Sequence, residues 1–311
     1  MSNFGGVYAF PATAMREDEE IDLVRYQEHI EWLLDAGVHG LVACGSTGEF
    51  AYLTFQERQQ IALATVERAR GRAPVLVMAS ALSTRDVLAH VRYAAAIGAD
   101  GVLVNPQSYF RLNARQIVGL YQAVSSAAGM PVFLYNAPAT TGVDMAPELI
   151  ARLALIPGVA GIKEGSGDVG RVSQIRRLSP DPFAIFCGHE ALALPTLMLG
   201  GAGWFSALAN LVPQLCVALY EHAARGEWEK ALVLHRRLEP LGCFLQERQL
   251  AAAVKTGLVL RGMSMGAPRQ PLTLLSELET DQLRLLLRKL DDDLTPVFSR
   301  IPLKEAVTES N

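Results

Sequence analysis

The chain has 311 residues, of which 50% are hydrophobic and 19% are charged, and its formal net charge is −4. This length is enough to bury a large core, either in one α/β domain or in two smaller ones. The slightly acidic balance excludes the basic surface that nucleic acid or an anionic membrane requires, so we expect a small molecule as the partner.

Four cysteines lie far apart with no Cys-x-x-Cys pair, which favours a reduced, cytoplasmic protein over a disulfide framework. Residues 1–20 lack a basic segment followed by an apolar run, so no secretory signal is expected. Residues 191–220 carry no charged side chain, but prolines and glycines interrupt the stretch repeatedly. It therefore predicts a buried helix, strand and helix rather than a membrane span.

Short apolar runs alternate with helical patterns through the first 220 residues. The expected strands are residues 7–10, 40–44, 74–79, 101–104, 131–134, 159–163, 183–186 and 204–207. The expected helices include residues 22–36, 54–70, 84–97, 113–128, 147–155 and 191–199, the second of which opens on a Thr-x-x-Glu capping box, Thr54 with Glu57. Eight such units with strands apolar on both faces predict an α/β fold, the (β/α)8 TIM barrel. An open doubly wound sheet is the alternative.

Three further helical patterns follow the eighth unit, at residues 228–245, 249–260 and 281–290. They predict a C-terminal helical extension, and no linker separates it from the barrel. We therefore expect three parts: the barrel in residues 1–225, the extension of the same unit in 226–295, and a polar, loosely held tail in 296–311.

Lys163 ends an apolar, strand-like run, where a charged amine requires an explanation, and no lysine precedes it in the chain. An amine held in a site drier than water shifts toward its neutral, nucleophilic form, which a Schiff-base lysine needs. The structural alternative is a lysine that extends from the strand end into solvent.

In a TIM barrel, functional groups lie at the C-terminal ends of the strands. Ser46, Thr47 and Gly48 follow the second expected strand in a Gly-Ser-Thr-Gly turn, Tyr135 follows the fifth, and Lys163 ends the sixth. Such a turn offers N–H groups and two hydroxyls to a carboxylate, and a tyrosine beside an amine can relay protons. Each motif also has a structural interpretation, as an ordinary turn or a core side chain. Their joint occurrence favours imine chemistry at Lys163.

A competing motif overlaps this region, because residues 165–170 match Gly-x-Gly-x-x-Gly between a strand and a helix. The pattern is typical of dinucleotide-binding oxidoreductases, but here it falls in the sixth unit of a regular series and leaves Lys163 unexplained. The six histidines show no paired metal-ligand spacing, so no metal is expected. His189 and Glu190 follow the seventh strand, and we expect them to line the active-site rim as a hydrogen-bonding pair.

These residues together resemble the dihydrodipicolinate synthase and N-acetylneuraminate lyase superfamily of pyruvate-dependent class I aldolases. The resemblance runs from about Gly6 to beyond Leu290. Its motifs, in the family's order and spacing, are residues 45–49 (Gly-Ser-Thr-Gly-Glu), 135–142 (Tyr-Asn-Ala-Pro to Thr-Gly), 161–164 (Gly-Ile-Lys-Glu) and 201–210.

The resemblance implies that Lys163 forms a Schiff base with a 2-oxo acid, usually pyruvate, and that Tyr135 is the proton relay. It implies that Ser46 and Thr47 hold the carboxylate and support the relay, and that Phe205 lines the wall beside the lysine. It also implies that no metal or organic cofactor is needed. Members are commonly homotetramers built as dimers of dimers, and sometimes dimers, so we expect one of these assemblies.

Two positions depart from the family pattern. Dihydrodipicolinate synthases carry an arginine two residues after the proline of the tyrosine motif, where it binds the carboxylate of the second substrate, and here that residue is Thr140. A neutral hydroxyl cannot replace a bidentate guanidinium. After the fourth strand, many members place a tyrosine that enters a neighbouring subunit's relay, whereas this chain has Ser108 there and Tyr109 next.

We therefore expect a carbon–carbon or carbon–oxygen lyase that acts on pyruvate or a related 2-oxo acid through an imine at Lys163. A polar rim favours a hydroxylated aldehyde as partner, and thus a 2-keto-3-deoxy sugar acid or hydroxy-oxo acid aldolase or dehydratase. The rim residues are Ser108, Thr140, His189 and Glu190, and Tyr109 is a further candidate for substrate binding. One alternative is 4-hydroxy-tetrahydrodipicolinate synthase, which condenses pyruvate with aspartate semialdehyde. Another is a non-catalytic sensor of 2-oxo acids, against which the intact lysine and tyrosine argue.

Overall fold

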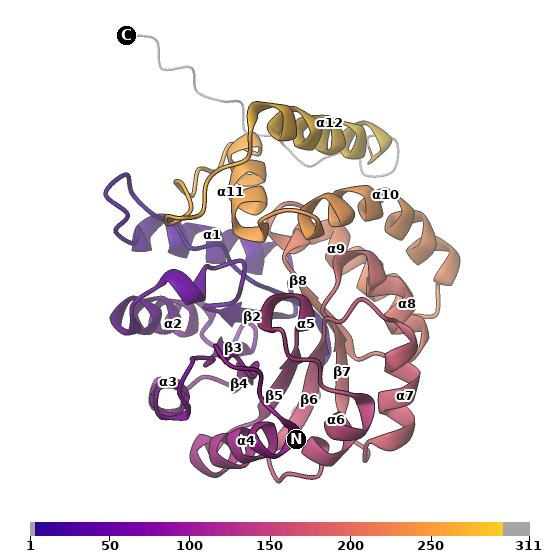
Figure 1. Ribbon diagram of the computed structural model, residues 1–311. Coiled ribbons are helices and arrows are strands. Elements are labelled where there is room, and N and C mark those ends of the chain that lie inside the picture. Colours follow the sequence, from indigo (N-terminus) through magenta and orange to yellow (C-terminus); the bar gives the residue numbers. More distant parts are fainter. Residues whose placement is uncertain (1–3, 295–311) are drawn as a thin grey trace.

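The computed structural model describes residues 4–294, in which eight parallel strands close into a barrel (Figure 1). Neighbouring strands pair in chain order, and β1 pairs with both β2 and β8. The strands are β1 (Gly6–Ala9), β2 (Gly40–Ala43), β3 (Val75–Met78), β4 (Gly101–Val104), β5 (Val132–Asn136), β6 (Val159–Glu164), β7 (Ala184–Cys187) and β8 (Gly203–Ser206). The predicted TIM barrel is confirmed, and the open sheet is excluded because the sheet closes on itself.

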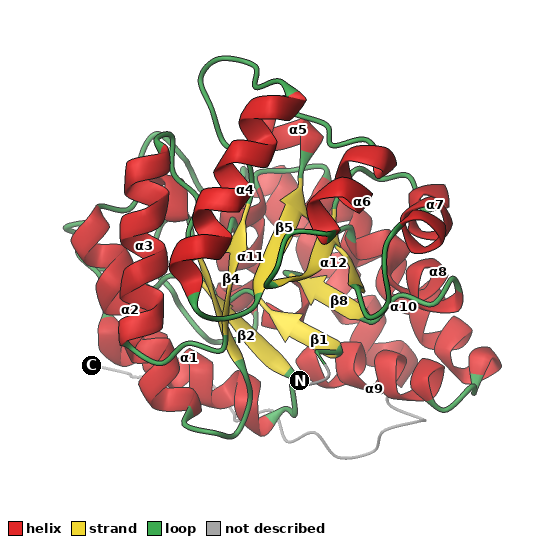
Figure 2. Ribbon diagram, turned by 90° about the horizontal axis from the view of Figure 1, so that it is seen from below, coloured by secondary structure: helices red, strands yellow, loops and turns green. Residues whose placement is uncertain are grey.

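Helices alternate with the strands and enclose them, as the view from below in Figure 2 shows. They are α1 (Leu23–Asp35), α2 (Phe55–Ala69), α3 (Thr84–Ala96), α4 (Ala114–Ala128), α5 (Pro138–Thr141), α6 (Pro147–Ala154), α7 (Gly170–Leu178), α8 (Ala193–Met198) and α9 (Pro213–Ala224), with the short 3-10 helices η1 (Phe50–Tyr52), η2 (Glu190–Leu192) and η3 (Leu208–Asn210). The predicted capping box at Thr54 and Glu57 is confirmed, since both of its reciprocal hydrogen bonds are present at the start of α2.

The C-terminal extension consists of α10 (Trp228–Gln246), α11 (Leu250–Leu260) and α12 (Glu277–Leu294), which confirms the predicted helices. Helix α10 packs on α9, and α12 packs on α10 and α11 (Figure 1). The last helix begins four residues earlier than expected, because Ser276 and Glu279 exchange hydrogen bonds at its start. The expected tail, residues 296–311, lies outside the described residues, and the division at residue 226 stays a prediction.

The inside of the barrel is filled with aromatic side chains. Rings of Tyr8, Phe186 and Phe205 contact one another with centroids 4.4 to 5.4 Å apart, and Phe133 lies 5.9 Å from Phe186. Gly40 makes room for this cluster, since a Cβ there would lie 2.2 Å from the Tyr8 ring. Because the interior is packed, a substrate can bind only at an end of the barrel.

Two local differences from the sequence expectations bear on the site. Strand β5 continues to Asn136, so Tyr135 lies within the strand instead of after it. Residues 138–141 form the short helix α5 where a loop was expected, because Ala137 O accepts hydrogen bonds from Thr140 N and Thr141 N. Both differences fix the backbone beside Tyr135 more firmly than a loop would.

The uncharged stretch 191–220 folds as predicted, with η2, α8, β8, η3 and α9 in succession. In the described part of the chain, none of the helices has both the length and the apolar character that crossing a bilayer requires.

Candidate active site

Lys163 and Tyr135 lie side by side near the C-terminal ends of neighbouring strands. The strand register pairs Tyr135 on β5 with Lys163 on β6, and Lys163 with Phe186 on β7. Both side chains are almost buried, with 6% of Lys163 and 7% of Tyr135 exposed. The predicted neighbours are therefore brought together at the end of the barrel where TIM-barrel enzymes carry their active sites.

The lysine amine lies among aromatic rings. Lys163 Nζ is 4.1 Å from the ring centre of Phe10 and 4.3 Å from that of Tyr135. Within residues 4–294, no carboxylate forms an ion pair with Nζ and no hydrogen bond reaches it. Aromatic faces contact an ammonium favourably without blocking its lone pair once it is deprotonated. The arrangement leaves the amine available to a carbonyl carbon.

Phe10 contacts both the 45–48 turn and the amine of Lys163. A Cβ at Gly45 would lie 1.8 Å from Cδ1 of Phe10, so glycine is required for the ring to occupy its place over Lys163 Nζ. Sequence reasoning did not identify Phe10 as a site residue. The sequence placed it at the end of the first expected strand, residues 7–10, but its contact with the lysine depends on packing across the barrel.

The turn itself offers unpaired N–H groups. Glu49 N and Phe50 N close it with hydrogen bonds to Ser46 O and Gly45 O, whereas the N–H groups of residues 46–48 donate to no acceptor within the described residues. Thr47 is buried and Ser46 is half-buried. Gly48 O accepts a hydrogen bond from Thr13 Oγ1 (2.7 Å), which orients the peptide. Convergent N–H groups of this kind suit a carboxylate.

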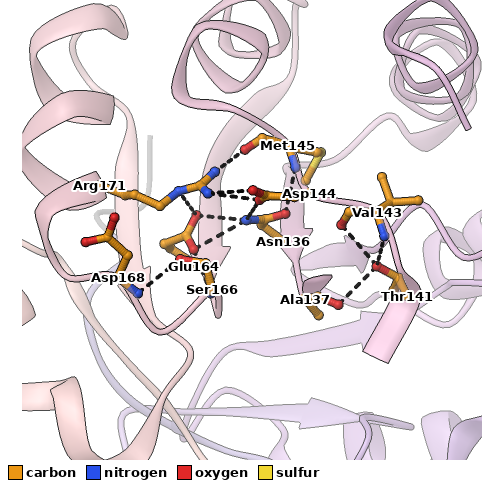
Figure 3. Close-up of polar contacts among 10 residues, drawn as sticks. All are labelled: Asn136, Ala137, Thr141, Val143, Asp144, Met145, Glu164, Ser166, Asp168 and Arg171. Atoms are coloured by element: carbon orange, nitrogen blue, oxygen red, sulfur yellow. Dashed lines mark hydrogen bonds and ion pairs between the residues drawn. The ribbon is translucent and has the colours of Figure 1, made fainter. Parts of the chain in front are cut away.

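Outside the barrel interior, a polar network fixes the ends of β5 and β6 (Figure 3). Side chains alternate along a strand, so the residues after Tyr135 and Lys163, namely Asn136 and Glu164, point away from the barrel interior. Asn136 Nδ2 donates to Glu164 Oε2 (3.2 Å) and Ser166 N donates to Glu164 Oε1 (2.7 Å). The two strand ends are thus joined by side chains as well as by the sheet.

Arg171 and Asp144 complete this network. Arg171 Nη1 donates to both oxygens of Asp144, at 2.9 and 3.0 Å, and Arg171 Nη2 donates to Met145 O. Burial raises the pKa of Glu164, against hydrogen bonds from Ser166 and Asn136 and the charge of Arg171. The glycines of the 165–170 motif therefore belong to a structural loop of the barrel, and a Cβ at Gly165 would lie 2.9 Å from Asn136 O.

Glu190 is placed differently from the expected rim position. It is buried, its Oε1 accepts from Ala207 N (2.6 Å), and its Oε2 accepts from Ser206 Oγ (3.0 Å). Burial raises the pKa of Glu190, against these hydrogen bonds and the positive charge of Lys163. The carboxylate therefore fixes the end of β8 near the lysine and is not presented free to the rim.

The remaining predicted residues differ in how deeply they are buried. Phe205 is buried in the aromatic cluster inside the barrel, beside Phe10 at 5.8 Å. His189 is half-buried, and burial lowers its pKa. Thr140 on α5 is exposed, Ser108 is half-buried, and Tyr109 is 88% exposed. Their predicted contacts with substrate stay predictions.

Lys255, which was not among the predicted site residues, forms a buried ion pair with Glu49 of the 45–49 motif, behind the turn. Lys255 Nζ lies 2.7 Å from Glu49 Oε1, and neither side chain is exposed. Lys255 interrupts an apolar helix, which is the same signal that identified Lys163, so it could have been noticed. The pairing itself could not be predicted, because Glu49 is far away in the sequence. As for metals, no cluster of three or more ligating side chains occurs within residues 4–294.

The chain matches the model of the dihydrodipicolinate synthetase family over residues 3–290. It belongs to this family. The family assignment confirms the predicted superfamily, and it makes the chain a lyase of the dihydrodipicolinate synthetase type that acts on small molecules.

Relatives within the dihydrodipicolinate synthetase family match along nearly their whole length. The chain is 37% identical to the 4-hydroxy-tetrahydrodipicolinate synthase of Methanospirillum hungatei over 291 residues, which cover 93% of this chain and 100% of the relative. The solved 4-hydroxy-tetrahydrodipicolinate synthase of Methylacidiphilum fumariolicum matches with a TM-score of 0.91 and 30% identity, covering 94% and 98% of the two chains. The structure of YagE, a prophage protein of E. coli K12 in complex with pyruvate, matches with a TM-score of 0.88 and 30% identity, covering 93% and 99%.

Proposed function

We propose that this lyase activates pyruvate, or a closely related 2-oxo acid, as an imine on Lys163. The observation that carries the proposal is the place of Lys163 Nζ, over the rings of Phe10 and Tyr135 at the C-terminal end of the barrel, with no ion-pair partner within residues 4–294. An amine in such a place can act as a nucleophile toward a carbonyl carbon. The related YagE was solved in complex with pyruvate, which supports the choice of 2-oxo acid.

The proposed reaction uses the lysine as both nucleophile and electron sink. The amine adds to the C2 carbonyl to give a carbinolamine, whose hydroxyl leaves as water after protonation and yields the iminium. Loss of a C3 proton then gives an enamine, whose C3 attacks an aldehyde and forms a carbon–carbon bond. Water finally hydrolyses the imine and restores the amine. Tyr135, whose ring lies 4.3 Å from Nζ, is proposed to relay the protons.

The turn at residues 45–48 is proposed to hold the carboxylate of the 2-oxo acid. Its N–H groups lack acceptors within residues 4–294, and Ser46 and Thr47 add hydroxyls to the same turn. A carboxylate fixed there, with its C2 carbon toward Lys163, is held for attack, and such orientation contributes strongly to rate.

The second substrate has two candidates. The names of the relatives favour aspartate semialdehyde, and thus 4-hydroxy-tetrahydrodipicolinate synthase, over the sugar-acid interpretation. We propose the synthase reaction as the first to test. Thr140 favours the second candidate, a hydroxylated aldehyde, since an exposed neutral side chain stands where the synthase pattern has an arginine.

Borohydride reduction in the presence of pyruvate tests the imine. The expected result is a stable adduct of reduced pyruvate on the peptide that contains Lys163, identified by mass spectrometry. Lys230→Ala, which removes an exposed lysine paired with Glu227, is the matched control and should trap as well as the wild type. Equal trapping by Lys163→Ala, or an adduct on another lysine, would overturn the proposal.

A substrate panel separates the two candidates. Aspartate semialdehyde, 4-hydroxy-2-oxo acids, 2-keto-3-deoxy sugar acids and N-acetylneuraminate are compared by kcat/KM. If a sugar acid is preferred, Thr140→Arg should raise turnover of aspartate semialdehyde about 10-fold, the value of one added charge-assisted hydrogen bond. Ala139→Arg, at the neighbouring exposed position, is the control. Efficient turnover of aspartate semialdehyde by the wild type would reject the argument from Thr140.

We also propose that the enzyme needs no metal or organic cofactor and works as a homotetramer or a dimer. The imine route supplies its own electron sink, so exhaustive treatment with a chelator should leave turnover unchanged. Tyr109 and Phe110 form an exposed T-shaped ring pair with centroids 5.1 Å apart, which is suited to a subunit contact. Light scattering should give the mass of an oligomer for the wild type, and a lower mass for Tyr109→Ser.

A further inference from the structure

The most deeply buried charged pair in the described part of the chain joins the C-terminal extension to the 45–48 turn. Lys255 on α11 places Nζ 2.7 Å from Glu49 Oε1, and both side chains are completely buried. Lys255 Nζ also donates to Ala267 O (2.9 Å), and Arg269 N donates to Glu49 Oε2 (2.7 Å). Each charge therefore has a second partner, and all of the partners outside the turn belong to the extension.

Burying this pair costs the solvation free energy of both charges. The ion pair and the two additional hydrogen bonds offset this cost. Burial lowers the pKa of Lys255, against the charge and the hydrogen bond of Glu49. A chain that needed only packing at this place could use an apolar pair of similar volume. The charged pair indicates that the position of Glu49 matters, because a carboxylate held from two sides has one position, whereas apolar side chains can shift.

The backbone of the turn explains why such fixing is required. Glu49 adopts a left-handed conformation with φ of 60°, and Cys44, on the other side of the turn, does the same with φ of 57°. A residue other than glycine is strained there, and the strain persists only where the surroundings hold it. The side chain of Glu49, held by Lys255 and Arg269 N, keeps its own backbone in place and with it the N–H groups of residues 46–48.

The same segment of the extension also holds the chain that leaves the turn. The Arg269 guanidinium donates to both carboxylate oxygens of Glu57, at 2.6 and 2.8 Å, and to Tyr52 O at 3.1 Å. Glu57 is the residue that closes the capping box at the start of α2. Residues 267–269 thus contact the turn, η1 and the first turn of α2 together.

We propose that Lys255 and Glu49 are positioning residues that hold the 45–48 turn in the conformation that binds the carboxylate of the 2-oxo acid. The inference rests on the proposed function, since it assigns the carboxylate to this turn. It gives the C-terminal extension a role in substrate selection: the extension fixes the part of the site that distinguishes a 2-oxo acid from a simple ketone.

The test compares two ketones on the same preparation. Inactivation by borohydride is measured with pyruvate and with acetone, which forms the same kind of imine but has no carboxylate. The ratio of the two trapping efficiencies does not depend on the fraction of folded protein, so a merely structural defect leaves it unchanged. In Lys255→Met, and in Glu49→Gln with Lys255→Met, the preference for pyruvate over acetone should fall at least about 10-fold, as expected when a charge-assisted hydrogen bond is lost.

A matched control lies in the same extension. Arg261→Gln removes the ion pair of Arg261 with Asp291, at 2.8 and 2.9 Å, leaves the contacts of Lys255 and Glu49 in place, and should keep the wild-type ratio. The double variant leaves no unpaired buried charge, so it should fold even where Lys255→Met does not. An unchanged ratio in the double variant, with wild-type trapping of pyruvate intact, overturns the positioning role alone. Failure of the wild type to trap pyruvate overturns the proposed function and this inference together.

Discussion

Two of the lysines within residues 4–294, Lys163 and Lys255, are buried, and their surroundings differ completely. Lys163, at the end of β6, lies over the rings of Phe10 and Tyr135, and no carboxylate pairs with it within the described residues. Lys255, in the middle of α11, is paired with Glu49 and bonded to Ala267 O. Burial alone therefore does not make a lysine a candidate nucleophile. What distinguishes the two is whether the protein has already satisfied the charge.

The difference suggests a division of work between barrel and extension. An amine without a partner can be used by a substrate, at a cost in stability, whereas an amine with two partners contributes to stability and to fixed geometry. Removing each lysine should therefore have opposite consequences for activity and for folding.

The largest expected effect is the loss of turnover in Lys163→Ala. Without the amine no imine forms, and the rate of the pyruvate-dependent reaction should fall by at least roughly 10⁴-fold. The free energy of unfolding should stay within about 1 kcal/mol of the wild type, because the amine has no ion pair or hydrogen bond to lose within residues 4–294. Steady-state rates and urea unfolding check both parts. A large loss of stability would show that Lys163 is a structural residue like Lys255.

Lys255→Met should behave in the opposite way. Breaking a buried pair leaves Glu49 as an uncompensated charge, so the free energy of unfolding should fall by about 3–5 kcal/mol. Adding Glu49→Gln should restore most of this loss. Chemical unfolding followed by circular dichroism measures the change, and Lys230→Met, at an exposed lysine, is the control. A loss below about 1 kcal/mol would mean that the pair is not sealed from water.

Gly188→Ala tests how tightly the stem of Lys163 is held. The added methyl group would lie 3.0 Å from Lys163 Cγ and 2.8 Å from Glu164 O. We expect a loss of about 1–3 kcal/mol in stability and of about 10- to 100-fold in turnover, because the amine is displaced. Gly119→Ala on α4, where a Cβ meets nothing within 4 Å, is the control and should be slightly stabilising. Equal activities of the two variants would show that the lysine stem adapts.

The smallest expected effect is the pH dependence of the stability that the ion pair between Arg269 of the extension and Glu57 of α2 contributes. The hydrogen bonds from Arg269 hold the pKa of Glu57 at about 2, below its ordinary value of 4.5. Since the folded pKa is depressed, the stabilisation is complete above pH 4.5 and is lost as the pH falls toward 2. Glu57→Gln should therefore cost about 1 kcal/mol at pH 7 and nothing near pH 2. Urea unfolding across this range measures the difference, and a cost that is independent of pH would contradict the assignment to the ion pair.

Much of the fold could be predicted from the periodicity of apolar residues, because each strand and helix has a recognisable local pattern. The alternation of apolar runs and helical patterns gives the barrel, and the residues at the strand ends give Lys163, Tyr135 and the 45–48 turn. The burial of Glu190 could not be predicted, because its partners, Ser206 and Ala207 N, belong to the next strand end. The sequence shows that a carboxylate is present but does not show which backbone groups lack a partner.

Other features depend on packing between distant segments. Lys255 and Glu49 each stand out in the sequence, yet nothing local joins them. The role of Phe10 depends on the absence of a side chain at Gly45, which a sequence records only as one more glycine in a turn. Contacts of this kind are set when the barrel closes, and they require the three-dimensional structure.

The contact between Gly45 and Phe10 has a consequence for how such sites change over generations. Any side chain at position 45 must displace the Phe10 ring from its place over the Lys163 amine, and any smaller residue at position 10 leaves a gap beside the turn. The two positions are therefore epistatic: a change at one becomes tolerable only after a matching change at the other. A mutagenesis library that varies one residue at a time will therefore score both positions as intolerant, whereas paired variation restores the packing between them.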